Sequence, residues 1–286
     1  MDDRMPRIRR NRYERDRPVI VVVGCDDVGS AIAHVLHDSG AAVVLVDAAD
    51  PPWSRRGMSY VDAWYVGGAT LDGVDACFCA SVKSIPAVLA RGDMIAATTW
   101  SWAGVATALQ PAALVVVRLA GAGSPFASPS PALGALPMIR VRTRASGTEV
   151  VAVAGPQRHP GGSIDFARDA GSAAFATLAP DLRVDAAVAG RFRTRHEIAE
   201  RVETGDVLGG VDGYAVAAPA SGVLRALCAR GARVAAGQTL VEIDRSGDTR
   251  SCFGVKEPAR AVAERVRAVV RSAMTGTASA DRVMAE

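Results

Sequence analysis

The chain has 286 residues, a length that allows two compact domains or one large domain with an appendage. Hydrophobic residues make up 49% and charged residues 22%, which excludes disorder along the whole chain because there is ample apolar surface to bury. The 33 basic and 30 acidic residues leave a net charge of +3, too balanced to indicate nucleic-acid binding. No apolar run approaches the length of a transmembrane helix. From the charge balance we expect no nucleic-acid partner, and from the lack of a long apolar run no membrane partner.

The N-terminal residues 1–17 are rich in Arg and Asp and have no apolar period. This composition predicts a solvated, disordered tail, with a basic docking arm as the alternative. The tail lacks the apolar segment of a signal peptide, and the five scattered cysteines do not indicate a disulfide framework. We therefore expect a cytoplasmic protein.

A strand–helix–strand unit opens the ordered part of the chain. The continuous β-branched run 19–23 predicts a strand buried on both faces, and the apolar spacing in 30–39 predicts a helix that ends at Gly40. A second strand is expected at 43–46, parallel to the first by the right-handed crossover rule. Further strands are expected at 76–80, 94–97 and 114–117, with a helix from Ser84 through Leu89. We predict an α/β fold with a Rossmann-like, doubly wound parallel sheet at 18–122.

The stretch that follows, 123–193, is predicted to be a linker and a middle α+β region. Its first part is rich in Gly, Ser and Pro, which is typical of a long loop. Candidate strands occupy 138–144 and 149–153, a Gly/Pro-rich turn covers 155–162, and a short helix is expected near 166–175.

An internal repeat marks the next region. Residues 202–208 and 234–240 share the frame V-x-x-G-x-x-L, and each copy leads into a short strand. Two such copies resemble the barrel-sandwich hybrid of lipoyl and biotinyl domains, which we place at 194–250. A carrier domain needs an exposed lysine on the hairpin near 210–213, yet the chain has no lysine between Lys83 and Lys256. We therefore expect a docking or sealing module without a swinging arm. A C-terminal helix and tail follow at 251–286, with the helix beginning at Glu257-Pro258.

The turn after the first strand reads G-C-D-D-V-G at 24–29. A dinucleotide fingerprint would have glycine in place of Asp26, where a carboxylate repels phosphate and blocks close approach. Asp47, at the end of the second strand, occupies the position of a ribose-binding acid. The position of this turn between a strand and a helix predicts nucleotide binding through Gly24, Asp27, Gly29 and Asp47. The alternative is a Rossmann-like scaffold that has lost its cofactor.

Arg55 and Arg56 follow in the next loop and can grip a phosphate or carboxylate, or remain solvated. Four tryptophans near the same sheet edge either line a pocket for a planar ring or cover the sheet: Trp53, Trp64, Trp100 and Trp102. The histidines and cysteines have no metal-ligand spacing, so no metal is expected. Catalytic residues cannot be assigned from the sequence.

The order of these motifs resembles the YqeB-like family, described as selenium-dependent molybdenum hydroxylase system proteins and related to the XdhC/CoxF maturation factors. The strongest stretch runs from A-P-A-S-G-V-L-R at 218–225 to I-D-R at 243–245, Asp248 and C-F at 252–253. R-R-x-M-S at 55–59 is similar to a second family motif. The chain departs from the glycine-rich G-G-G-D turn and from a G-L-G-P-G-F segment, of which Gly155-Pro156 remains.

This resemblance implies an accessory or maturation factor for a molybdenum hydroxylase. It implies binding of a pterin or nucleotide-type cofactor, such as molybdopterin dinucleotide or another nucleotide, and docking of a client enzyme. In this hypothesis Arg55 and Arg56 pair with phosphate, and Asp47 accepts ribose hydroxyls. An NAD(P)-dependent oxidoreductase and a non-catalytic adaptor with an empty scaffold stay open as alternatives, as does a homo-oligomer.

Overall fold

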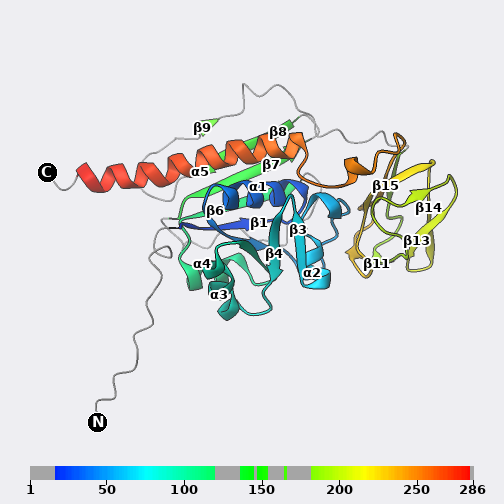
Figure 1. Ribbon diagram of the computed structural model, residues 1–286, viewed down its shortest axis with the longest axis horizontal. Helices are drawn as coiled ribbons and strands as arrows, with labels where there is room; N and C mark the ends of the chain where they lie inside the picture. The colour runs from blue at the N-terminus through cyan, green and yellow to red at the C-terminus, as the bar shows by residue number, and fades with distance from the viewer. Residues whose placement is uncertain (1–16, 120–135, 145–146, 154–163, 166–181, 284–286) are drawn as a thin grey trace, which may run out of the picture.

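The computed structural model describes residues 17–119, 136–144, 147–153, 164–165 and 182–283. Two units lie side by side along the long axis of the molecule (Figure 1). The first contains a large sheet covered by the long C-terminal helix, and the second is a small β unit. None of the helices in these ranges has the length and apolar character that crossing a membrane would require. Of the tail predicted at 1–17, only Arg17 belongs to the described residues. Its guanidinium donates to the carbonyl oxygens of Gly40 and Ala41.

The first unit is built on a mixed, mostly parallel sheet. Its described strands follow the order β3-β4-β5-β2-β1-β6-β7-β8-β9, and the six from β4 to β7 run parallel. Their bounds are β1 Val19–Val23, β2 Ala42–Val46, β3 Gly68–Leu71, β4 Val74–Phe78, β5 Met94–Thr98, β6 Ala113–Leu119, β7 Met138–Arg144, β8 Gly147–Val153 and β9 Ile164–Asp165. The predicted first strand is confirmed, and its residues 20–23 are 0–2% exposed because helices cover both faces.

Helices cover this sheet from both sides, as its continuous apolar strands require. They are α1 Asp27–Asp38, α2 Asp62–Val66, α3 Ile85–Arg91, α4 Trp102–Leu109 and α5 Glu257–Val283, with short 3₁₀ turns at Arg56–Met58, Val82–Ser84 and Thr249–Cys252. Ile20 and Val22 contact the cluster that contains α1 and α5, whereas Val21 and Val23 contact the cluster of α3 and α4. Figure 1 shows α1 and α5 on one side of the sheet and α3 and α4 on the other.

The sheet runs past residue 122, where the sequence analysis ends the first domain. The strands expected at 138–144 and 149–153 are confirmed as β7 and β8, but β7 pairs with β6 and thereby extends the same sheet. The order also differs from the usual dinucleotide-binding order, because β5 lies between β2 and β4. The turn and helix expected at 155–162 and 166–175 lie outside the described residues.

The second unit consists of two antiparallel four-stranded sheets, ordered β10-β17-β15-β12 and β14-β13-β11-β16. The strands are β10 Arg183–Asp185, β11 Gly190–Arg193, β12 Arg201–Val202, β13 Val207–Val211, β14 Tyr214–Ala217, β15 Gly222–Leu227, β16 Arg233–Val234 and β17 Thr239–Asp244. Phe192, Leu208, Leu224 and Leu240 are fully buried in its separate core. This unit begins at β10, before residue 194 where the sequence analysis starts it.

The internal repeat corresponds to two strand–turn–strand segments. Each copy carries one glycine at positive φ in its turn, Gly205 at +92° and Gly237 at +78°, a conformation that other residues adopt only with strain. The first copy passes from β12 to β13 and the second from β16 to β17. Each copy therefore crosses from one sheet to the other, in opposite directions, which explains the shared V-x-x-G-x-x-L frame.

Candidate functional site

The turn between β1 and α1 brings the helix unusually close to the strand. Gly24 has a φ of +107°, and a Cβ at Gly29 would lie 1.9 Å from the carbonyl oxygen of Gly24. Both predicted glycines are therefore required by the backbone itself. Because neither glycine has a Cβ, the N-terminus of α1 can lie against the carboxyl end of β1. This is the edge at which doubly wound sheets bind ligands.

Asp26 occupies the N-terminus of α1 with its own carboxylate. Its Oδ1 accepts from the amide of Gly29 at 2.7 Å, and the residue is 4% exposed. Burial and the neighbouring charge of Asp27 raise the pKa of Asp26 to about 8. In a nucleotide site, the amide of Gly29 would be free to bind a phosphate. Here it already donates to the side chain of Asp26.

Asp47 is also used inside the protein. It is 5% exposed, and its Oδ2 accepts from the amide of Cys25 at 2.7 Å and from Trp53 Nε1 at 2.9 Å. Its Oδ1 accepts from the amide of Ala48. The carboxylate predicted to bind a ribose thus joins the β1–α1 turn to the loop that follows β2.

Arg55 lies between carboxylates from both units. Its Nη1 donates to Asp27 Oδ2 at 2.8 Å, and its Nε and Nη2 donate to Glu242 of β17 at 3.0–3.2 Å. The side chains are 20%, 16% and 8% exposed for Arg55, Asp27 and Glu242. Burial acts to lower the pKa of Arg55, but the two carboxylates outweigh it and raise the pKa overall. We call these three residues the Arg55 clamp.

Arg56 does not join this group. Its Nε donates instead to Asp62, the first residue of α2. The structure therefore brings together five of the six predicted residues, Gly24, Asp27, Gly29, Asp47 and Arg55, around one turn. Their role in binding a ligand stays a prediction.

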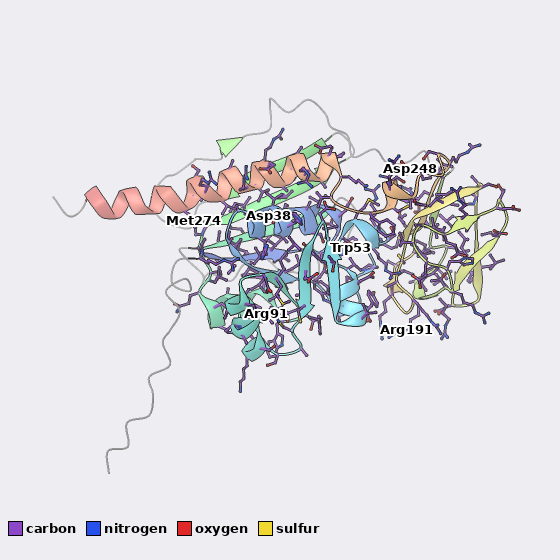
Figure 2. All side chains as sticks on the ribbon, in the orientation of Figure 1. Asp38, Trp53, Arg91, Arg191, Asp248 and Met274 are labelled. Atoms are coloured by element: carbon purple, nitrogen blue, oxygen red, sulfur yellow. The ribbon has the colours of Figure 1, made fainter. Side chains whose placement is uncertain are left out.

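The loop that carries Arg55 contacts the second unit at several points. We call residues 50–57 the junction segment. Its contacts with the second unit, besides the Arg55 clamp, are Ser54 O with the amide of Leu227 at 2.7 Å, Pro52 O with Cys228 Sγ at 3.3 Å and Gln238 Nε2 at 3.4 Å, and Asp50 with Arg233 at 3.4 Å and Arg191 at 4.0 Å. Figure 2 shows the labelled Trp53 at the boundary between the units. The segment therefore fastens the β unit to the sheet edge.

Three roles in this region were missed by the sequence analysis. Asp26 directly precedes a helix, and this position favours Asp as an N-cap, so its role could have been recognised. Trp53 has no signal of its own. Glu242 lies 187 residues from Arg55 along the chain, and no local pattern connects them.

The four tryptophans do not form one pocket. Trp64 packs against the core cluster that includes α1 and α5 and contacts the ring of Phe78, whereas Trp102 is buried in the cluster on the opposite face of the sheet. Trp100 is 44% exposed and donates to the carbonyl oxygen of Ala80. In the described ranges, no three His, Cys, Asp or Glu side chains are grouped so as to hold a metal ion.

Comparison with known proteins finds a distant sequence relative. The chain is 25% identical over 256 residues to the uncharacterized protein YqeB of Escherichia coli (strain K12), covering 85% of this chain and 46% of YqeB. The chain thus spans less than half the length of that relative. No protein-family model matches.

Solved structures show only distant similarity. Escherichia coli MccB matches with a TM-score of 0.26 and 17% identity, covering 52% of this chain and 40% of MccB. An aspartoacylase family protein from Mesorhizobium loti matches with a TM-score of 0.22 and 11% identity, covering 80% of this chain and 52% of that protein. Similarity at this level supports no assignment of fold or activity.

Proposed function

We propose that this chain is an accessory factor for a molybdenum hydroxylase and that it acts as a two-domain docking protein. The observation that carries the docking part is the Arg55 clamp, in which the cation predicted to bind a phosphate is neutralised by Asp27 and Glu242. The molybdenum-hydroxylase part rests on the resemblance of the sequence to the YqeB-like family and on its similarity to YqeB.

The electrostatics of the turn favour docking over cofactor binding there. Asp26, Asp27 and Asp47 place three carboxyl groups around the N-terminus of α1, and Arg55 is already paired with two carboxylates. A phosphate would have to displace an internal ion pair and meet like charge. The same groups hold the two units together, which is the property that a rigid docking protein needs.

The architecture fits the same proposal. We infer that the sheet unit is Rossmann-like and that the two four-stranded sheets form a barrel-sandwich hybrid, supported by the crossing of each repeat copy between the sheets. The hairpin of β13 and β14 turns at Asp212-Gly213, where a carrier domain would present its lysine. With no lysine to acylate, the unit serves to bind a client rather than to carry a group.

Deletion of the gene in its host tests the proposed function. We expect the activity and bound molybdenum of the host's molybdenum hydroxylases to fall while the amount of hydroxylase protein stays the same. The wild-type chain and the Asp26→Asn variant, which preserves the internal cap, should both restore activity. Unchanged activity and molybdenum content after deletion would contradict the proposal.

A second candidate is the binding of a pterin or nucleotide cofactor at the β1–α1 turn. It is favoured by the position of Arg55, which stays 20% exposed beside the N-terminus of α1. An anionic ligand would then replace Asp27 as the partner of Arg55. An NAD(P)-dependent oxidoreductase is less favoured, because Asp26 occupies the Gly29 amide next to which the pyrophosphate would bind.

A further inference from the structure

Edge strands of the β unit differ in how they are protected. The two sheets have β10, β12, β14 and β16 at their edges. Three of these strands are two or three residues long and carry charged side chains, which discourage pairing with another chain: Arg183 and Asp185 in β10, Arg201 in β12 and Arg233 in β16. β14 has four residues, Tyr-Ala-Val-Ala, with no charge and no proline.

Exposed apolar side chains surround this unprotected edge. Tyr214 in β14 is 58% exposed, and Val207 in the neighbouring β13 is 65% exposed. Val207 pairs with Ala217, whose small side chain leaves it uncovered. Among the described residues, no strand pairs with the outer side of β14.

The backbone of β14 has a defined set of free groups. Val211 and Tyr214 close the two-residue turn, so Tyr214 directs its N–H and C=O toward β13. At the other end, Ala218 donates to Asp206 O and accepts from the amide of Gly205, again on the β13 side. By alternation, Ala215 and Ala217 direct their N–H and C=O groups to the open edge.

We propose that β14 pairs with β14 of a second copy of this chain, antiparallel and with Val216 on the two-fold axis. In this register each Ala215 faces Ala217 of the partner subunit, and both have free backbone groups, so four hydrogen bonds form. Tyr214 then lies opposite the small Ala218 of the partner subunit. A strand that is uncharged and complementary to itself fits a second copy without any like-charge contact at the edge.

This inference does not depend on the proposed function. Four residues on each side bury little area, so the dimer is weak and forms as concentration rises. Sedimentation velocity from about 1 µM to about 1 mM should show a shift from monomer to dimer in the wild-type chain.

Two variants test the register. Ala215→Pro removes an N–H that faces the open edge and no hydrogen bond within the unit, so it should fold like the wild type and stay monomeric. Ala217→Lys places a charge at the edge and should have the same effect. Ala215→Ser keeps the N–H and is the matched control, expected to dimerise like the wild type. A wild-type chain that is monomeric throughout, or dimers that survive both Ala215→Pro and Ala217→Lys, would overturn the proposal.

Discussion

At the scale of single residues, the Arg55 clamp decides how the candidate site is understood. Two adjacent arginines have the same local sequence signal, but Arg55 pairs with Asp27 and Glu242 across the junction of the two units, whereas Arg56 pairs with Asp62 at the start of α2. Their partners lie 28, 187 and 6 positions away, so a sequence pattern can nominate the arginines but cannot assign their partners.

Replacement of Arg55 should be strongly destabilising. Arg55→Ala leaves two mostly buried carboxylates without their partner, and we expect the free energy of unfolding to fall by about 3 kcal/mol. The loss should be smaller in the double variant Arg55→Ala with Glu242→Leu, because it removes one of the unpaired charges. Urea unfolding measures both, and Arg91→Ala, which removes an exposed pair with Asp93, is the control expected to leave the midpoint unchanged. Equal losses in the single and double variants would contradict the clamp.

Asp26 should make stability depend on pH. Its pKa is raised to about 8 by burial and by Asp27, so the folded chain keeps a proton that the unfolded chain releases above about pH 4. This contribution to stability is present at low pH and is lost as pH rises toward 8. Asp26→Asn keeps a cap for Gly29 without the charge, and should stabilise the chain by a few kcal/mol at pH 8 and hardly at all at pH 4. Denaturation at both pH values checks this, and a gain that does not change with pH would refute it.

At the scale of elements, the C-terminal helix is held by a hairpin far away in the sequence. Asp72, in the turn between β3 and β4, accepts from the amide of Val255 at 3.0 Å and from Arg260 at 3.3 Å. The hairpin therefore fixes where α5 begins. The predicted start at Glu257 and the apolar stripe of the helix are confirmed, since Ala259, Ala263 and Val266 are buried against the first unit.

Loss of Asp72 should loosen the start of α5. Asp72→Ala removes the bond to Val255 and the pair with Arg260, and we expect a loss of about 1 kcal/mol with faster hydrogen exchange in the first turns of α5. Asp75→Ala in the same hairpin removes a bond to Thr70 and is the matched control. Equal exchange in the two variants would show that the hairpin does not hold the helix.

Local sequence signals predicted elements better than their partners. The β-branched runs gave β1 and β2 because a strand buried on both faces needs no alternation, and the glycine spacing identified the turns of the repeat. The pairing of β7 with β6 was not predicted, because the two strands are separated by a long Gly/Ser/Pro-rich stretch and pairing is a long-range property. Likewise, β10 was predicted to belong to the middle region at 123–193, whereas the structure places it in a sheet of the second unit.

At the scale of the whole molecule, the junction segment connects the candidate site to the β unit. Arg55, predicted to face a ligand, instead joins the sheet edge to Glu242 of β17. In the same segment, Ser54 and Pro52 contact Leu227 at the end of β15 and the following Cys228. The turn glycines and Asp47 could be predicted from their order in the chain. Their use as internal partners could not, because it depends on Trp53 and Glu242 meeting them in three dimensions.

The central claim is that the β1–α1 turn is satisfied by the chain's own carboxylates and does not take a nucleotide. Calorimetric titration of the full chain with NADH and with molybdopterin dinucleotide tests this most directly, together with thermal melting, since a ligand at 100 times its Kd would add about 2.7 kcal/mol. We predict no saturable heat and no rise in Tm with either compound. Saturable binding that raises Tm and is weakened by Arg55→Ala with Arg56→Ala would contradict the account.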